Sequence, residues 1–199
     1  MRALGYWRLS ANFLGLVEAA GGELVKADNA WVVVGDTSLI DHYEEMTRWS
    51  DHRIGVPLLF NLFHGVELML KGFLSLKRPV PGHHRLSQLH AQFESDFPGT
   101  TLGSVVLASV VDPDPTSPLG RFFATNCIDV DKWYEALKYP ESRSGGQFDH
   151  AELRYGAGET LAFWDGVRRS AIEMRVAAVE LAEELGEIPS TEPRQQLGS

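Results

Sequence analysis

The sequence predicts an all-α protein, an antiparallel helical bundle with four to five core helices and an N-terminal helical extension. In several segments apolar residues recur every three or four positions, which is the period of a helix packed on one face. The alternation typical of half-buried strands is almost absent, and proline-containing stretches separate the helical segments. Helices joined in this way favour a bundle.

The segment from Val56 to Leu76 is the most apolar and organises the predicted fold. On a helical wheel one broad arc is apolar and includes Leu59, Leu62, Phe63, Val66, Met69, Leu70 and Phe73. The other side carries a polar stripe with His64, Glu67 and Lys71, beside Gly65 and Gly72. Because the apolar arc is too wide for a surface helix, we expect neighbouring helices to enclose this segment on most sides.

The elements around this segment are predicted from local signals. Pro57 is expected in the first turn of the central helix, where a missing N–H matters little. The range 105–111 fits a helix or a strand equally well, and we assign it to a helix because its neighbours are helical. The last helix is expected to begin at Asp149, with Glu152 completing a capping box, and to run to Leu185.

Length and composition predict one domain over residues 1–189 and a disordered tail over 190–199. With 199 residues, 44% of them hydrophobic, the chain can form one sizeable core. The single cysteine, Cys127, excludes an internal disulfide and a cysteine-based zinc site, and a cytoplasmic location is expected. No motif for a metal or a cofactor is found, so we expect neither.

Charge restricts the classes of partner. The net charge is −9, and residues 100–199 carry 16 acidic against 9 basic side chains. Since proteins that coat nucleic acid non-specifically are usually basic, any contact with nucleic acid must be local. His64, Glu67 and Lys71 lie in the middle of the most apolar segment, where charges are costly in lipid, so we expect no membrane span.

The polar stripe has three interpretations. Glu67 and Lys71 at i, i+4 can form an exposed pair that stabilises a helix by about 0.2–0.5 kcal/mol. Alternatively, His64, Glu67 and Lys71 share a binding pocket between this helix and the last one, with shifted pKa values. Thirdly, they form a buried structural network that binds nothing.

Several motifs together resemble the HEPN superfamily of prokaryotic helical bundles. They are HGVELMLKGFL in the central helix, GHHRLSQL at the start of the next helix, and LKYP before a loop and the long last helix. The resemblance covers about Pro57 to Leu185 and implies a HEPN-like core over 56–189, with 1–55 as the extension. Many HEPN proteins are metal-independent ribonucleases with an Arg-x4-6-His motif that acts across a dimer. Others lack the motif and serve as binding modules.

The resemblance implies an RNA- or nucleotide-associated binding module of a prokaryotic defence or toxin–antitoxin system, with an operon-encoded partner protein. One alternative is a metal-independent ribonuclease in which His150 moves the proton of a ribose 2′-OH and Arg143 holds the phosphate. Arg-to-His spacings of this kind also arise by chance, and Arg143-x6-His150 is selected by its place before the last helix. The flexible Gly145-Gly146 between the two residues disfavours catalysis. The other alternative is a structural or protein-interaction bundle.

Further candidates have both a binding and a structural interpretation. His83 and His84 follow Gly82 and either cap the next helix or bind a ligand. Lys138 and Tyr139 either end a helix favourably or bind a phosphate. We also expect a homodimer, because an apolar stripe lies beyond the main seam of the last helix: Phe163, Ile172, Val176 and Val179.

Overall fold

The computed structural model describes residues 2–30 and 40–189, and the regular structure within them is helical. The helices are α1 (Arg2–Lys26), α2 (Ile40–Met46), α3 (Asp51–Leu74), α4 (Leu86–Asp96), α5 (Thr101–Val106), α6 (Pro118–Thr125), α7 (Trp133–Ala136) and α8 (Leu161–Glu184). An isolated bridge pairs Glu141 with Gln147. The predicted all-α fold is confirmed, while the tail 190–199 lies outside the described residues.

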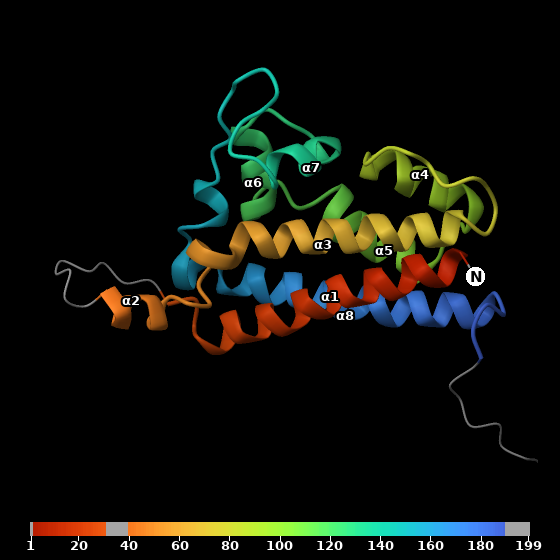
Figure 1. Ribbon diagram of the computed structural model, residues 1–199, viewed down its shortest axis with the longest axis horizontal. Coiled ribbons are helices and arrows are strands. Elements are labelled where there is room, and N and C mark those ends of the chain that lie inside the picture. Colours follow the sequence, from red (N-terminus) through yellow and green to blue (C-terminus); the bar gives the residue numbers. More distant parts are fainter. Residues whose placement is uncertain (1, 31–39, 190–199) are drawn as a thin grey trace, which may run out of the picture.

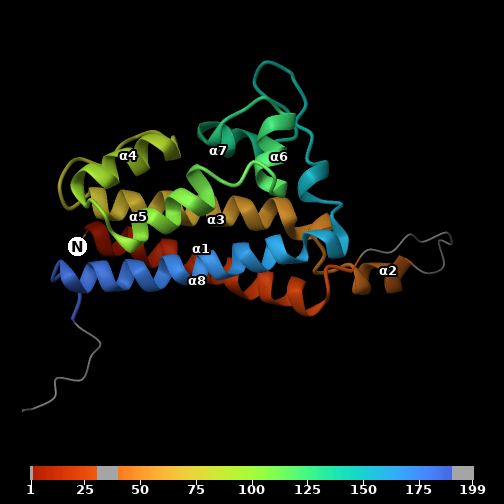
Figure 2. The same ribbon diagram turned by 180° about the vertical axis from the view of Figure 1, so that it is seen from behind.

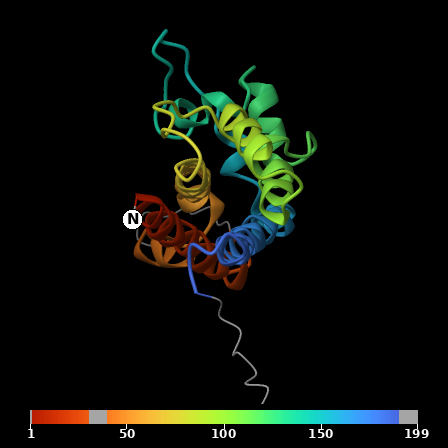
Figure 3. The same cartoon turned by 90° about the vertical axis from the view of Figure 1, so that its right-hand side faces the viewer.

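The helices form two layers around α3. The long helices α1, α3 and α8 lie side by side, and α4, α6 and α7 cover the other side of α3 (Figures 1 and 3). α5 lies along α8, as the view from behind shows (Figure 2). α1 runs antiparallel to α3 and α8, whereas α3 and α8 run in the same direction because α4 to α7 return the chain to the starting end of α3 (Figure 1).

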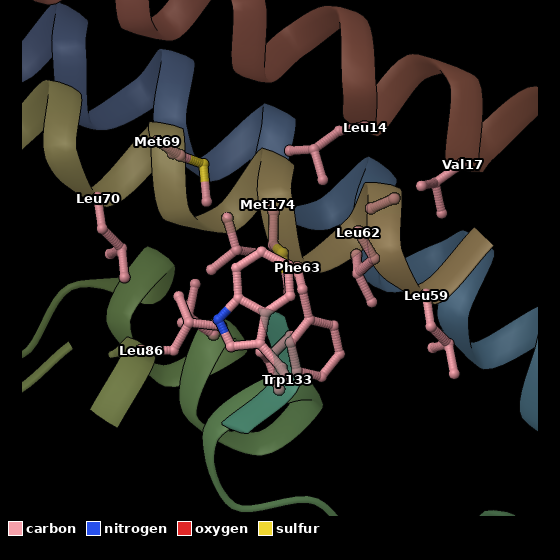
Figure 4. Packing of buried hydrophobic residues seen from close by; sticks show 14 of the residues in the cluster. Leu14, Val17, Leu59, Leu62, Phe63, Met69, Leu70, Leu86, Trp133 and Met174 are labelled. Atoms are coloured by element: carbon pink, nitrogen blue, oxygen red, sulfur yellow. The ribbon is translucent and has the colours of Figure 1, made fainter. Parts of the chain in front are cut away.

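The core surrounds α3 on both sides. Leu14 and Val17 of α1 pack against one side of α3, and Trp133 of α7 lies beside Phe63 on the other (Figure 4). Each of these side chains is at most 1% exposed, and burial of a large apolar side chain contributes about 1.5–3 kcal/mol. α1 falls within the expected extension, yet it shares one core with residues 56–189.

Two glycines of the polar stripe let α1 approach α3 closely. A Cβ atom on Gly65 would lie 2.9 Å from the side chain of Leu14, and one on Gly72 would lie 2.5 Å from the indole of Trp7. A larger residue at either position would have to displace α1. The polar stripe of α3 therefore borders α1, which belongs to the predicted N-terminal extension.

Two helix boundaries differ from the prediction. α3 begins at Asp51, so Pro57 lies inside the helix rather than in its first turn. The last helix begins at Leu161 rather than Asp149, and short 3₁₀ turns, Ala151–Leu153 and Ala157–Thr160, precede it. Asp149 caps only a local turn, because its carboxylate accepts the Ala151 N–H at 2.8 Å. The helical assignment of 105–111 is confirmed by α5 and a π-helical turn, Leu107–Val111.

One helical stretch, Tyr43–Leu74, is long and apolar enough to cross a membrane by length and composition. Of its most apolar window, 67% is buried inside the protein. A core helix gives the same signal, and here neighbouring helices cover α3 (Figure 3). The expectation of no membrane span stays a prediction.

Candidate functional site

The polar stripe of α3 is the base of a central polar cluster, which consists of His64, Glu67, Lys71, His84 and Tyr134. Glu67 is only 2% exposed, and its Oε1 accepts hydrogen bonds from Lys71 Nζ at 2.6 Å and from His84 Nδ1 at 2.9 Å. The side chain of Lys71 is 9% exposed. The interpretation of Glu67 and Lys71 as an exposed helix pair is therefore wrong.

Aromatic rings hold the two histidines of the cluster. The His84 ring stacks on Tyr134 with centroids 4.3 Å apart. The His64 ring lies edge-on to Phe13 of α1 at 4.7 Å, and its Nδ1 is 3.5 Å from Glu67 Oε2, too far for a good hydrogen bond. The neighbours of the stripe thus come from α1, α7 and the loop before α4, and not from the last helix as expected.

The charges of the central polar cluster are balanced. Burial by itself raises the pKa of Glu67, but contacts with His64, Lys71 and His84 outweigh it and lower the pKa to about 2. At neutral pH the carboxylate is ionised, so we infer that His84 donates through Nδ1. The side chains of His84 and His64 are 46% and 25% exposed, so both imidazole rings are partly accessible.

His83 does not join the central polar cluster. Its Nδ1 accepts the backbone N–H of Arg85 at 3.2 Å within the loop. Arg85 is the N-cap residue of α4, and its own side chain makes no capping hydrogen bond. The first turn of this helix is capped instead by Asp131, whose Oδ1 accepts the Ser87 N–H at 2.9 Å. The expectation that His83 or His84 caps the helix is therefore wrong, and the two adjacent histidines have different neighbours.

A second polar site lies at the end of the bundle where α3 begins. We define the terminal groove by five side chains: His52 and Arg53 of α3, Lys138 after α7, and His150 and Arg154 before α8. They line a pocket of about 240 Å³, and no carboxylate is among its lining residues. In a chain with a net charge of −9, this is a local concentration of cationic and imidazole groups.

A buried carboxylate assembles the terminal groove. Asp51 is 1% exposed, and its Oδ2 accepts hydrogen bonds from Asn29 at 3.0 Å, Thr160 at 3.0 Å and the Gly156 N–H at 3.1 Å. These bonds join the end of α1, the start of α3 and the segment before α8. As a result Arg154 lies against α3, where its Nε donates to the carbonyl oxygen of His52 at 3.2 Å.

The cationic groups of the groove contact aromatic rings. Lys138 Nζ donates to Tyr134 Oη at 3.0 Å, which raises the pKa of Lys138, and it lies 5.2 Å from the ring centroid of Tyr139. Tyr139 is 47% exposed, so its ring is accessible at the mouth of the groove. Tyr134 also stacks on His84, and this ring connects the groove to the central polar cluster.

The two histidines of the groove have different surroundings. The pKa of His52 is lowered by burial first, then by Arg154 and Arg53, while Asp51 acts in the opposite direction. His52 is therefore neutral at pH 7, and its buried Nδ1 has no hydrogen-bond partner within residues 2–30 and 40–189. His150 Nε2 lies 2.7 Å from the Ala136 carbonyl oxygen, so this nitrogen is the donor.

The predicted catalytic pair is not joined by a contact. Arg143 is exposed in the loop after α7, where its backbone N–H donates to Glu135 Oε1 at 2.7 Å, and it does not line the groove. Between residues 40 and 189 no hydrogen bond or ion pair links it to His150. Of the predicted site residues, the structure brings Lys138, Tyr139 and His150 together, and places His64, Glu67, Lys71 and His84 in the central polar cluster.

Sequence reasoning missed His52, Arg53 and Arg154. No motif in the sequence singles out His52, and within the described residues no group of three or more metal-ligating side chains occurs. The place of Arg154 in the groove is not predicted, because the sequence assigns residues 149–160 to the last helix, which in fact begins at Leu161. The signal available was the sequence His52-Arg53 at the start of α3, next to the buried Asp51.

Comparisons with protein families, with curated proteins and with solved structures found no match to this chain. The motifs that suggested a HEPN protein lie at the two polar sites. HGVELMLKGFL and GHHRLSQL supply the central polar cluster, and LKYP supplies Lys138 and Tyr139 of the groove. Membership of the HEPN superfamily stays a prediction.

Proposed function

We propose that this protein is a HEPN-like binding module that holds single-stranded RNA or a nucleotide in the terminal groove. The observation that carries the proposal is the lining of the groove. Five cationic or imidazole side chains surround one pocket without a carboxylate, in a chain whose net charge is −9. The resemblance of the sequence motifs to the HEPN superfamily further leads us to propose a role in a prokaryotic defence or toxin–antitoxin system, with an operon-encoded partner protein.

The groove is physically suited to a phosphate. Arg53, Lys138 and Arg154 bring positive charges together, and only Arg53 has an ion-pair partner, Glu44 at 3.7 Å, among the described residues. Their mutual repulsion opposes folding and is relieved when an anion binds. Cations that neutralise phosphates also release counterions, so binding should weaken as salt is added. The exposed ring of Tyr139 offers a surface on which a base can stack.

Fluorescence anisotropy with a labelled single-stranded RNA at two salt concentrations tests the proposal. We expect the double variant Lys138→Gln/Arg154→Gln to bind at least tenfold more weakly. The slope of log K against log salt concentration should become shallower by about one to two, because up to two phosphate contacts are lost. Lys77→Gln is the matched control, because Lys77 is an exposed lysine over an aromatic ring, Phe97 at 5.8 Å, at the other end of α3. Equal losses in both variants, or no binding by the wild type, would refute the proposal.

The ribonuclease alternative is favoured by one observation, the position of His150 beside Arg154 in the same groove. In this arrangement His150 shares the groove with Arg154, whereas Arg143 does not line it. We nevertheless expect no cleavage, because His150 Nε2 is held by a backbone carbonyl. Incubation of RNA with a chelator settles the point: 2′,3′-cyclic phosphate ends that disappear in His150→Ala would establish catalysis.

A further inference from the structure

A second pocket adjoins the terminal groove and differs from it chemically. It has a volume of about 390 Å³ and shares Pro140, His150 and Arg154 with the groove. Its remaining lining includes two carboxylates, Glu141 and Asp149, which the groove lacks, and the side-chain amide of Gln147, which can donate or accept. We call it the acceptor pocket, because ionised carboxylates only accept hydrogen bonds.

We propose that the acceptor pocket holds one base of the bound RNA and selects bases that carry an exocyclic amino group. This inference rests on the proposed function, since it assumes that the phosphate next to that base lies in the terminal groove. It assigns Glu141 and Asp149 as specificity-determining residues. The clearest consequence is a preference for cytosine over uracil, two pyrimidines of similar size.

The size and walls of the acceptor pocket suit a single base. Its volume of about 390 Å³ lies within the usual range for small-molecule sites, whereas the groove at about 240 Å³ is smaller. Tyr155 and Phe148 contribute aromatic rings to the lining, and Tyr155 is 53% exposed. Proteins that read single-stranded RNA stack bases on such rings and on arginine planes.

Arg154 connects the two pockets and is fixed in place. Its Nε is hydrogen-bonded to the His52 carbonyl oxygen, and its guanidinium lies 5.5 Å from the ring centroid of Tyr155. The same side chain lines the groove and the acceptor pocket. If a nucleotide lies with its phosphate beside Lys138 and its base beside Tyr155, Arg154 is therefore placed between the two and can contact both parts.

The two carboxylates are free to discriminate between bases. Asp149 uses Oδ1 for the N–H of Ala151, which orients its side chain, and no hydrogen bond to its Oδ2 is found among the described residues. Glu141 is exposed, and its side chain has no ion-pair or hydrogen-bond partner there. A carboxylate attracts the N4 amino group of cytosine and repels the O4 oxygen that uracil carries at that position.

The test compares labelled oligo(rC) and oligo(rU) of equal length with the full chain by anisotropy. We expect the wild type to bind oligo(rC) roughly fivefold or more tightly than oligo(rU). In Glu141→Gln/Asp149→Asn the amides also present donors, so the preference should fall below about twofold, mainly by tighter binding of oligo(rU). Glu159→Gln, an exposed carboxylate outside both pockets, is the matched control and should keep the preference.

The outcomes separate this inference from the proposed function. If neither RNA binds, both are wrong. If both RNAs bind equally, and Lys138→Gln/Arg154→Gln still weakens binding, only the base selection is wrong. A preference that survives in Glu141→Gln/Asp149→Asn, or is lost to the same extent in Glu159→Gln, would also overturn the assignment of the two carboxylates.

Discussion

The two polar sites along α3 are built on opposite electrostatic principles. In the central polar cluster, opposite charges meet away from water, because Lys71 donates a hydrogen bond to the buried carboxylate of Glu67. In the terminal groove, groups of one sign gather at the surface, and Arg154 and Arg53 help to lower the pKa of His52. The first arrangement pairs its charges within the chain, whereas no carboxylate lines the second.

This difference separates positions that maintain the fold from positions that bind. Breaking a buried pair leaves a charge without compensation, which is strongly destabilising. Removing one of several like charges at a surface changes folding little, because solvent and salt screen it. We therefore expect substitutions in the central polar cluster to change stability and substitutions in the groove to change binding.

The largest expected effect is that of Lys71→Met. It leaves the carboxylate of Glu67, 2% exposed, without its cation, and we expect a loss of about 3–5 kcal/mol in the free energy of unfolding, measured by urea denaturation. Glu67→Leu/Lys71→Met removes both charges and should recover much of that loss. A change below about 0.5 kcal/mol for Lys71→Met would show that the pair does not behave as buried.

The second-largest expected effect is the contribution of Glu67 to the pH dependence of stability. Its pKa falls from an ordinary value of 4.5 to about 2 in the folded protein, so its contribution is complete above pH 4.5 and is lost as the pH falls towards 2. The shift corresponds to a contribution on the order of 3 kcal/mol. Glu67→Gln should lack this part of the acid destabilisation in parallel urea titrations, and identical pH profiles would contradict the assignment.

A smaller effect is expected on self-association, through a surface that belongs to neither polar site. Of the apolar stripe predicted on α8, Val176 and Val179 are 52% and 44% exposed, whereas Phe163 packs against the core. The homodimer stays a prediction. We expect light scattering to show a dimer at tens of micromolar, and Val176→Ser/Val179→Ser to weaken it at least tenfold. RNA binding in the groove should be unchanged in this variant, and a monomeric wild type would exclude the dimer.

The smallest effect is on the pKa of His52, and it probes the charge concentration in the groove. Arg154→Gln should raise this pKa, but not fully to 6.5, because burial contributes more than Arg154 does to lowering it. Arg154→Lys keeps the charge and serves as the control. The imidazole signals of His52 in an NMR titration give both values, and no difference between the two variants would contradict the proposed electrostatics.

The helices were predictable because their signal is local. Periodic apolar residues identified α3, and the same pattern identified α8, although the predicted start at Asp149 was wrong and the helix begins at Leu161. The i, i+4 spacing of Glu67 and Lys71 revealed a pair but not its burial, because His84 and Tyr134 approach from other elements. Non-periodic segments carry no such signal.

The terminal groove was not predictable, because it is formed by contacts between distant segments and not by a local periodic pattern. It depends on hydrogen bonds from Asp51 to Asn29 and Thr160, residues that are far apart in the chain. It also depends on the 3₁₀ turns before α8, where Ala157 has a φ of +44° that no helical pattern indicates. Arg154 therefore reaches the groove through a fold that no short motif describes.

Photo-crosslinking tests the binding site most directly. Single-stranded RNA is irradiated with the full chain at 254 nm or with a photoreactive base, and the modified peptides are identified by mass spectrometry. We predict crosslinks in the peptides that contain Tyr139 and Tyr155, lost when Lys138 and Arg154 are both replaced by glutamine. Crosslinks confined to α8, or to the central polar cluster at His84 and Tyr134, would contradict a binding site in the terminal groove.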